Sequence, residues 1–328
     1  MGNLNKLRRI KGLHFLFVAR DWFMEKTGLF ALKKAIKYRL FLKHLAREDK
    51  RLKKETARQI MSLPDSMIGG QIKDDDFVLS LTSYGERVEG SLPYALYSLA
   101  TQTVRPKKIA VYLDREHWSD EKLPSLLRKL QSVGVEFNYC EDLRSHTKLI
   151  PALVQYPNNP IITFDDDMYY NSDCLSWMTE AYQKSDKKTI LGQWGAIPEM
   201  KNGKFIPYND WKDCKNGDEH SPISFFGCSG VCYPPHVFDE EILKKELFLK
   251  LCPKADDIWF WAMEERQQIK RAYIPQKGYG YHRPVDRFYE FEVGGDNSLT
   301  KSNVINGENN QQLRNVLDYY HLDEVNAQ

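Results

Sequence analysis

Several features that would place a protein in a simple class are missing from this 328-residue sequence. Its six cysteines are scattered without a Cys-x-x-Cys pair, and the closest two are Cys228 and Cys232. That spacing argues against a disulfide scaffold and a structural zinc site, and it favours a reducing compartment. No apolar run approaches the ~20 residues that span a bilayer. The longest early run, Phe15 to Ala19, is also shorter than the ~7–15 apolar residues of a secretory signal. We therefore expect a cytoplasmic protein.

Acidic residues are scarce at the start of the chain. Residues 1–60 contain 17 Lys or Arg and 5 Asp or Glu, a charge of +12, so the rest carries −10 although the whole is only +2. Leu29, Leu32, Ile36 and Leu40 would share one side of a helix there. Such a segment can dock on the anionic inner face of a membrane. The alternatives are helices packed on the body with solvated lysines, or nucleic-acid binding, for which no recognised module is present.

The run Pro160-Ile161-Ile162-Thr163-Phe164 predicts a buried strand, and it ends abruptly in Asp165, Asp166 and Asp167. Alternate residues of an extended segment point the same way. Asp165 and Asp167 can therefore converge on one hard cation while Asp166 faces elsewhere. A divalent ion held by carboxylates suits a diphosphate, such as that of a nucleotide-sugar. The plainer alternative is an acidic loop that solvates the end of a strand.

Strand and helix patterns alternate along the centre of the chain. Strands are expected at 77–83, 108–113, 135–139 and 160–164, and helices at 92–101, 148–155 and from a cap at Ser119 to Leu130. This alternation predicts an α/β protein, with a mostly parallel sheet flanked by helices. Right-handed crossovers gather the strand ends on one edge, and with them Thr82, Ser83, Asp114 and residues 165–167.

Three segments in order resemble a known family. They are Leu81-Thr82-Ser83-Tyr84-Gly85-Glu86-Arg87-Val88, Ser98-Leu99-Ala100-Thr101-Gln102-Thr103 and Lys108-Ile109-Ala110-Val111-Tyr112-Leu113, with the Asp-x-Asp of 165–167 after them. The set resembles GT-A fold (Rossmann-like) glycosyltransferases, closest to family-2-like bacterial enzymes that build capsular polysaccharide or lipopolysaccharide. The resemblance implies a GT-A catalytic domain over 74–300. A basic amphipathic helical extension (1–73) would precede it, and a tail with one helix (301–328) would follow.

The resemblance also implies roles for single residues. Nucleotide contacts fall on Thr82, Ser83, Tyr84, Arg87, Asp114, Lys148, Asp165 and Asp166, and metal ligands on Asp165, Asp167 and His282. The metal, Mn²⁺ or Mg²⁺, would bridge the two phosphates and stabilise the nucleoside diphosphate leaving group. Other readings stay open: Thr82 and Ser83 as turn residues, Arg87 as a surface charge, and His282 as a structural residue.

Ala255-Asp256-Asp257-Ile258-Trp259-Phe260 resembles the family's acidic dyad, whose second acid removes the proton of the acceptor hydroxyl. A hydroxyl is a poor nucleophile, so direct displacement at the anomeric carbon needs a positioned base. Asp257 is the expected base and Asp256 the alternative. Two acids at a helix start also suit N-capping. A single displacement inverts the anomeric configuration, so we expect an inverting enzyme.

Three further segments allow two readings each. The loop Phe226-Gly227-Cys228-Ser229-Gly230-Val231 is either a close backbone approach to the sugar or an ordinary connection. Residues 295–299 are a hypothetical lid, and Arg283 and Arg287 are phosphate contacts or surface charges. The aromatic residues between 190 and 260 form an acceptor groove or, more commonly, core.

These observations predict a metal-dependent hexosyl- or N-acetylhexosaminyltransferase. It would move a sugar from a nucleotide-sugar, by family frequency a UDP-sugar, to a hydroxyl of a bacterial surface glycan or lipid-linked acceptor at the inner membrane face. One alternative is a metal-dependent nucleotidyl- or phosphotransferase acting on sugars, which normally needs a Gly-rich phosphate loop that is not found here. The other is a non-catalytic carbohydrate-binding protein. It would have little use for Asp165, Asp167 and Asp257 together.

Overall fold

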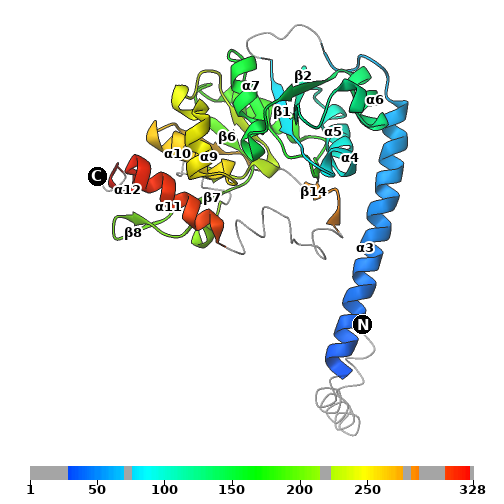
Figure 1. The fold of residues 1–328 in the computed structure, drawn as a ribbon, viewed down its shortest axis with the longest axis horizontal. Helices are drawn as coiled ribbons and strands as arrows, with labels where there is room; N and C mark the ends of the chain where they lie inside the picture. Colours follow the sequence, from blue (N-terminus) through cyan, green and yellow to red (C-terminus); the bar gives the residue numbers. More distant parts are fainter. Residues whose placement is uncertain (1–28, 70–75, 215–222, 276–281, 288–306, 326–328) are drawn as a thin grey trace.

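The centre of the molecule is a seven-stranded sheet with the order β13-β6-β12-β4-β1-β2-β3 (Figure 1). Its strands are β1 (Val78–Thr82), β2 (Lys108–Asp114), β3 (Val135–Cys140), β4 (Ile161–Thr163), β6 (Ile190–Gly192), β12 (Val231–Tyr233) and β13 (Arg271–Tyr273). The first four are parallel neighbours, β12 is antiparallel to β4 and β6, and β13 is parallel to β6. The computed structural model describes residues 29–69, 76–214, 223–275, 282–287 and 307–325, so the hypothetical lid at 295–299 lies outside it.

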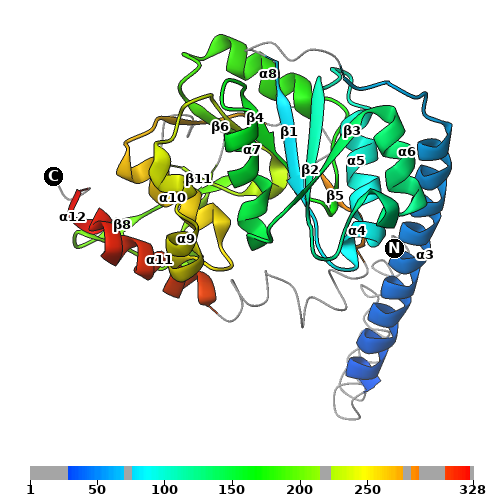
Figure 2. The same ribbon diagram turned by 45° about the horizontal axis from the view of Figure 1, so that its top comes forward.

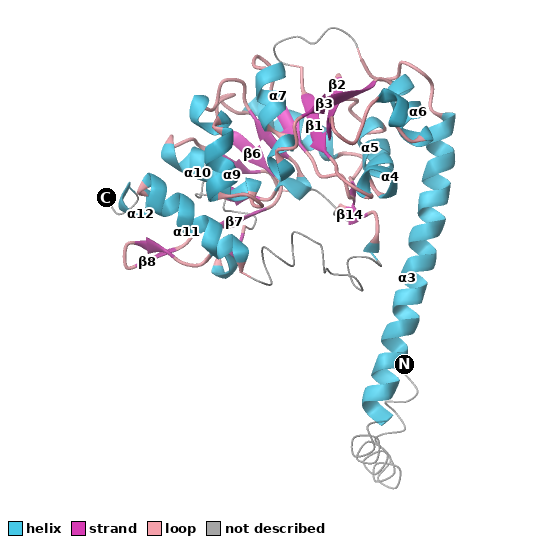
Figure 3. Ribbon diagram, in the orientation of Figure 1, coloured by secondary structure: helices cyan, strands magenta, loops and turns pink. Residues whose placement is uncertain are grey.

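Helices cover both faces of this sheet (Figures 2 and 3). Alternate side chains of a strand point to opposite faces, and in β1 Leu79 and Leu81 join one core while Val78 joins the other. The Leu79 side packs on α3 (Leu29–Ser62), α5 (Leu92–Ala100), α6 (Ser125–Val133) and α8 (Cys174–Lys184). The Val78 side packs on α7 (Ile150–Gln155), α9 (Lys245–Leu251), α10 (Asp256–Arg266) and α11 (Glu308–Tyr320). The predicted α/β class, a mostly parallel sheet between helices, is confirmed.

Short elements complete the described part of the chain. Three small sheets pair β5 (Met168–Tyr169) with β14 (Arg283–Pro284), β8 (Met200–Lys201) with β9 (Lys204–Phe205), and β7 (Gly195–Ile197) with β10 (Lys212–Asp213) and β11 (Ser224–Phe225). The short helices are α4 (Arg87–Gly90) and α12 (Leu322–Val325), with 3-10 turns η1 (Asp120–Lys122), η2 (Arg144–Lys148), η3 (Tyr208–Asp210), η4 (Gly227–Ser229) and η5 (Glu240–Leu243).

Two predicted helices begin elsewhere than expected, and a proline lies near each start. The single helix predicted from Ser119 to Leu130 is wrong, because η1 ends first and α6 begins only after Pro124. Proline lacks the N–H donor and disfavours a helical residue before it, so it is tolerated only at or before the first turn. The helix predicted over 148–155 is η2 followed by α7, which carries Pro151 in its first turn. The helix expected in the tail is α11, and the short α12 follows it.

Helix α3 is one 34-residue helix that extends well beyond the body (Figure 1). Its C-terminal half packs on the body through buried residues such as Thr56 and Ile60. Leu32, Ile36 and Leu40 in the N-terminal half are 54%, 50% and 61% exposed, so they form an apolar stripe on one side, as the sequence predicted. No helix among the residues that the structure describes is long and apolar enough to cross a membrane.

Candidate active site

The C-terminal ends of β1, β2 and β4 meet at one edge of the sheet, as predicted. Thr82 lies opposite Tyr112 of β2, and Ser80 lies opposite Thr163 of β4. A cavity of about 1280 Å³ opens along this edge and is lined by all the predicted site residues except Asp167 and His282. The cavity therefore brings residues 82–87, 114, 148, 165–166 and 256–257 into one site.

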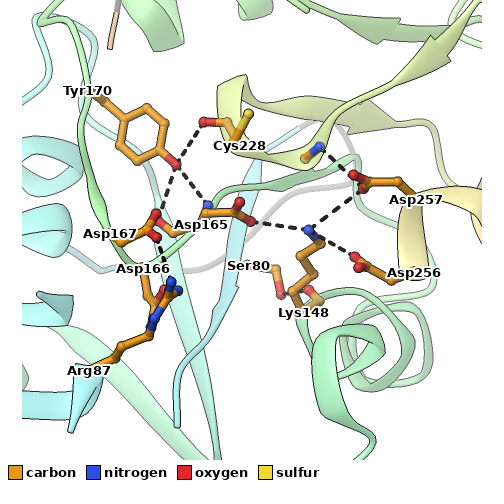
Figure 4. A network of polar contacts seen from close by, with 11 residues as sticks. Ser80, Arg87, Lys148, Asp165, Asp166, Asp167, Tyr170, Cys228, Asp256 and Asp257 are labelled. Carbon is orange, nitrogen blue, oxygen red and sulfur yellow. Dashed lines mark hydrogen bonds and ion pairs between the residues drawn. The ribbon is translucent and has the colours of Figure 1, made fainter. Parts of the chain in front are cut away.

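Asp166 and Asp167 are both held by Arg87 (Figure 4). Asp166 is 4% exposed and accepts hydrogen bonds from Ser83 Oγ at 2.5 Å and Arg87 Nη1 at 2.8 Å. Arg87 Nη2 lies 2.9 Å from Asp167 Oδ2. Burial nevertheless raises the pKa of Asp166, and it raises the pKa of Asp167 to about 7, with the neighbouring carboxylates adding to the effect. One guanidinium does not fully compensate the charge of three successive carboxylates.

Asp165 points toward a different cation. Its Oδ1 lies 3.1 Å from Lys148 Nζ, whereas Asp167 pairs with Arg87. The sequence suggested that Asp165 and Asp167 converge on one point, and in this structure they do not. The backbone of Asp165 is fixed by the Tyr170 hydroxyl, which accepts from its N–H at 2.8 Å and donates to the carbonyl of Cys228 at 3.2 Å. Tyr170 therefore joins the end of β4 to the loop before β12. Sequence reasoning missed this residue, because nothing local distinguishes it from core.

Lys148 is the centre of the site. Its Nζ is 2.8 Å from Asp256 Oδ2 and 3.8 Å from Asp257 Oδ1, in addition to its contact with Asp165 (Figure 4). The residue is 6% exposed. Burial alone would lower the pKa of Lys148, but the three carboxylates raise it well above its usual value. The sequence predicted Lys148 as a ribose or phosphate contact. The structure shows it as a buried ion-pair partner that joins the Asp-x-Asp segment to the acidic pair.

The environments of Asp256 and Asp257 push their pKa values apart. Burial works to raise the pKa of Asp256, but Lys148 outweighs it and holds that pKa below the usual range. Burial raises the pKa of Asp257 to about 7, because Lys148 is farther away and both Asp256 and Asp165 repel its charge. Asp257 is also the more exposed of the two, at 28% against 8% of the side chain. A carboxylate with a pKa near neutrality suits a general base.

The loop before β12 approaches this pair closely. The N–H of Gly227 donates to Asp257 Oδ1 at 3.2 Å. A Cβ at position 227 would lie 2.3 Å from Lys148 Nζ and 3.3 Å from Asp257 Oδ1. Only glycine fits there without displacing the ion pairs, so the loop makes a close backbone approach to Lys148 and Asp257, and its approach to a sugar stays a prediction.

The strand ends of β2 and β3 form the other end of the cavity. Asp114 accepts from the N–H of Glu116 at 2.9 Å and contacts the ring of His117, and these hydrogen bonds lower its pKa. Thr82 donates to the carbonyl of Tyr112 at 2.9 Å, and Tyr84 is 53% exposed. Trp118, Asp142 and Arg144 also line this end, and sequence reasoning missed them. The last two follow β3, so the rule that ligands bind at strand ends could have found them.

A divalent metal fits this site by charge and ligand chemistry. Five carboxylates surround only two cations, which leaves an excess of three negative charges when all are ionised; the carboxylates are Asp165, Asp166, Asp167, Asp256 and Asp257. Carboxylate oxygens are the ligands that Mg²⁺ and Mn²⁺ prefer. Within the described ranges no three potential ligands are already grouped around one point. Asp165 lines the cavity and its side chain is 31% exposed, so it would be available to hold an ion.

The residues predicted after position 280 lie away from the cavity. His282 is engaged at both ring nitrogens, with Asn171 N at 3.3 Å and Gln193 Oε1 at 3.3 Å, and burial lowers its pKa to about 4. This placement favours the structural reading of His282 over the metal ligand. Arg283 and Arg287 bind Asp49 of α3 at 2.7 and 2.9 Å. Their charges attach the helix to the body, and this contact agrees with neither a lining position in the cavity nor a purely exposed charge.

The chain resembles solved structures only distantly. A scan against protein-family models finds no match, and a search of curated proteins finds none. The chain is similar to a cytidylyltransferase from Leptospira borgpetersenii serovar Hardjo-bovis at 12% identity and TM-score 0.42, over 73% of this chain and 98% of that one. It is similar to S. aureus TarS in complex with UDP-GlcNAc at 16% identity and TM-score 0.43, over 76% of this chain and 81% of that one. It is also similar to the mannosyltransferase PcManGT from Pyrobaculum calidifontis in complex with GDP-Man and Mn²⁺. The identity is 13% and the TM-score 0.38, over 88% of this chain and 84% of that one. At this distance, an argument about function depends on the site itself.

Proposed function

We propose that this protein is an inverting, metal-dependent glycosyltransferase that takes a sugar from a nucleotide-sugar, in the first instance a UDP-sugar. One observation carries the proposal: two acidic segments about 90 residues apart meet at Lys148 in a single cavity. One of them offers carboxylates at a strand end, and the other offers Asp257 with a pKa of about 7. The acceptor in this proposal is a hydroxyl of a surface glycan or lipid-linked saccharide.

The two ends of the site would divide the reaction between them. Residues at the ends of β1 and β2 bind the nucleotide, and the carboxylates of Asp165 to Asp167 would hold a divalent ion, whose positive charge would offset that of the diphosphate. Asp257 accepts the proton of the acceptor hydroxyl, whose oxygen forms a bond to the anomeric carbon. The bond from that carbon to the phosphate oxygen breaks at the same time, and the nucleoside diphosphate leaves with the electron pair.

The base distinguishes this proposal from nucleotidyl transfer. A sugar phosphate that attacks a nucleoside triphosphate is already ionised at neutral pH, so it needs no group to remove a proton. A hydroxyl acceptor does need one. The placement of Asp257 beside Gly227, in the cavity wall, therefore favours transfer to a hydroxyl over nucleotidyl transfer to a sugar phosphate.

Calorimetry with UDP, GDP, CMP and dTDP, with and without Mn²⁺, tests the donor half. We expect one nucleotide diphosphate to bind only with the metal, and Asp165→Asn to weaken that binding. Asp257→Asn should keep nucleotide binding and lose transfer. Asp210→Asn changes an acidic residue outside the cavity lining and is the matched control. Absence of metal-dependent nucleotide binding, or pyrophosphate rather than nucleoside diphosphate as product, would contradict the proposal.

We also propose that α3 docks on the anionic inner face of the cell membrane. Residues 29–47 contain six Lys or Arg and no Asp or Glu. On a helix of 3.6 residues per turn, the exposed stripe of Leu32, Ile36 and Leu40 lies far around from Asp49, Thr56 and Ile60, which contact the body, so it faces away from the body. An apolar stripe bordered by lysines suits the boundary between headgroups and acyl chains.

Co-sedimentation with vesicles tests this docking. Each basic residue near an anionic surface contributes about 1 kcal/mol, so removing two should weaken binding by about 30-fold. We expect that loss for the double variant Lys33→Gln/Lys37→Gln with phosphatidylglycerol vesicles. The matched control is Lys184→Gln/Lys187→Gln, which removes two lysines of the body and should bind like the wild type. Equal binding of all three proteins would refute docking through α3.

A further inference from the structure

The end of the cavity farthest from β2 is walled by aromatic rings. Trp194 follows β6, which β12 and β4 separate from β1 in the sheet, so it lies at the opposite end from Asp114. Tyr208 and Phe226 line the same end. Trp194 is 44% exposed, although the buried Trp259 and Trp261 show that most tryptophans of this region are core. An exposed large ring in a cavity wall is a candidate contact for a ligand.

A continuous series of ring contacts holds Trp194 in place. The buried Trp261 packs on Trp211 with centroids 5.2 Å apart, and Trp211 packs on Tyr208 at 4.9 Å. The ring centroids of Tyr208 and Phe226 are 6.4 Å apart. Phe226 and Trp194 form a T-shaped pair, with centroids 5.5 Å apart and an angle of 84° between the ring planes. The series runs from the core to the cavity, so the exposed ring is supported from behind by packed side chains.

This aromatic end adjoins the proposed base. Phe226 directly precedes Gly227, whose N–H donates to Asp257. Tyr208 contacts the ring of Phe226, and burial together with the charge of Asp257 raises the pKa of Tyr208 well above its usual value. A molecule bound against these rings would therefore present its groups to Asp257.

A buried amide completes this end of the cavity. Asn309 of α11 lines the cavity and is 6% exposed, and its Oδ1 has no hydrogen-bond donor among the described residues. It lies close to η3, since Asn209 N donates to the adjacent Asn310 Oδ1 at 3.3 Å. An amide oxygen accepts hydrogen bonds, and leaving one buried without a donor is costly. A ligand hydroxyl would satisfy it.

We propose that Trp194, Tyr208, Phe226 and Asn309 form the binding site for the acceptor saccharide. A pyranose has an apolar C–H face, which would stack on Trp194, and hydroxyls at its edge, one of which would donate to Asn309 Oδ1. The cavity volume of about 1280 Å³ exceeds the ~300–1,000 Å³ of a site for one small molecule, so the cavity has room for an acceptor beside the nucleotide-sugar. This inference rests on the proposed glycosyltransferase function, and it adds where the acceptor binds and that a sugar ring is what binds there.

Saturation-transfer NMR on the full chain tests this site with a panel of methyl glycosides of hexoses and N-acetylhexosamines. We expect at least one glycoside to bind the wild type, and Trp194→Ala to weaken it by about fivefold or more. Trp194→Phe should restore part of the loss, and Asn309→Leu should reduce binding too. Trp118→Ala is the matched control, because it removes a tryptophan from the nucleotide end of the same cavity and should leave glycoside binding unchanged.

The outcomes separate this inference from the proposed function. No glycoside binding to the wild type, or equal binding by wild type and Trp194→Ala, overturns the acceptor site even if metal-dependent nucleotide binding is found. Glycoside binding that depends on Trp194 supports the site, and nucleotide binding measured on the same samples decides the proposed function separately.

Discussion

Replacing Lys148 by Met should destabilise the protein in a way that depends on pH. The ammonium is buried and lies 3.1 Å from Asp165 and 2.8 Å from Asp256. Methionine keeps much of the side-chain volume but leaves these carboxylates without their shared cation. Removing one partner of a buried ion pair costs about 3–5 kcal/mol in free energy of unfolding. For a chain of this size, that is a fall in Tm of roughly 4–7 °C.

The sign of the pH effect follows from the carboxylates. Without Lys148, the pKa of Asp256 should rise above its value in the unfolded chain, because burial is no longer outweighed. A carboxyl with a raised pKa in the folded state destabilises the fold as the pH increases through that pKa. The loss in Lys148→Met should therefore be largest near pH 8 and shrink near pH 5, where the carboxyls become protonated. Asp256→Asn in the same chain should recover part of it.

Urea unfolding at both pH values measures this effect. The control is Lys245→Met, which breaks an ion pair with Glu141 whose side chains are 43% and 62% exposed. Exposed pairs contribute about 0–1 kcal/mol, so this variant should unfold almost like the wild type at either pH. A loss below about 1 kcal/mol in Lys148→Met, or an equal loss at both pH values, would show that the carboxylates do not depend on Lys148.

Three further measurements examine the base, the loop and the helix. Gly227→Ala should lower transfer by about tenfold or more with little effect on nucleotide binding, because its Cβ would displace Lys148, whereas Gly90→Ala, with open space around it, should not. The value of kcat/KM should rise with pH up to about 7 and then level, since Asp257 must lose its proton, and a flat profile from pH 5.5 to 8 would exclude it as the base. Asp49→Ala leaves two arginines without their buried partner, so the protein should lose about 3 kcal/mol of stability and α3 should become sensitive to protease; unchanged cleavage would contradict this anchoring role.

Much of the fold could be predicted because its signals are local. β1 and β2 are buried on both faces, so they appear in the sequence as short apolar runs between turn residues. The errors concern prolines, since a periodic pattern continued through Pro124 while the backbone could not. The predicted site residues at strand ends were brought together for the same reason, because parallel strands end on one edge.

The connections within the site could not be predicted, because they join distant parts of the chain. No pattern in the sequence indicates that Lys148 contacts Asp165 and Asp256 at once, or that Tyr170 reaches Cys228. The same holds for Arg283, where a charge near the end of the catalytic segment suggested phosphate but pairs with α3 instead. Residue type and position in the sequence identified the charged residues of the site. Only the packing of the folded chain shows which of these residues form ion pairs with each other.

The attachment of α3 gives the molecule a fixed reach. Asp49 fastens the helix to β14 and to Arg287 just after it, and the stripe at Ile36 lies 13 residues before Asp49, about 20 Å away along a helix. A helix that docks through a stripe on its side lies in the plane of the membrane surface, so these 20 Å would be a lateral distance along that surface. Under the proposed docking, the body would sit beside the docked half of the helix at a fixed offset, and acceptors anchored in the same membrane would reach the cavity by diffusing in its plane.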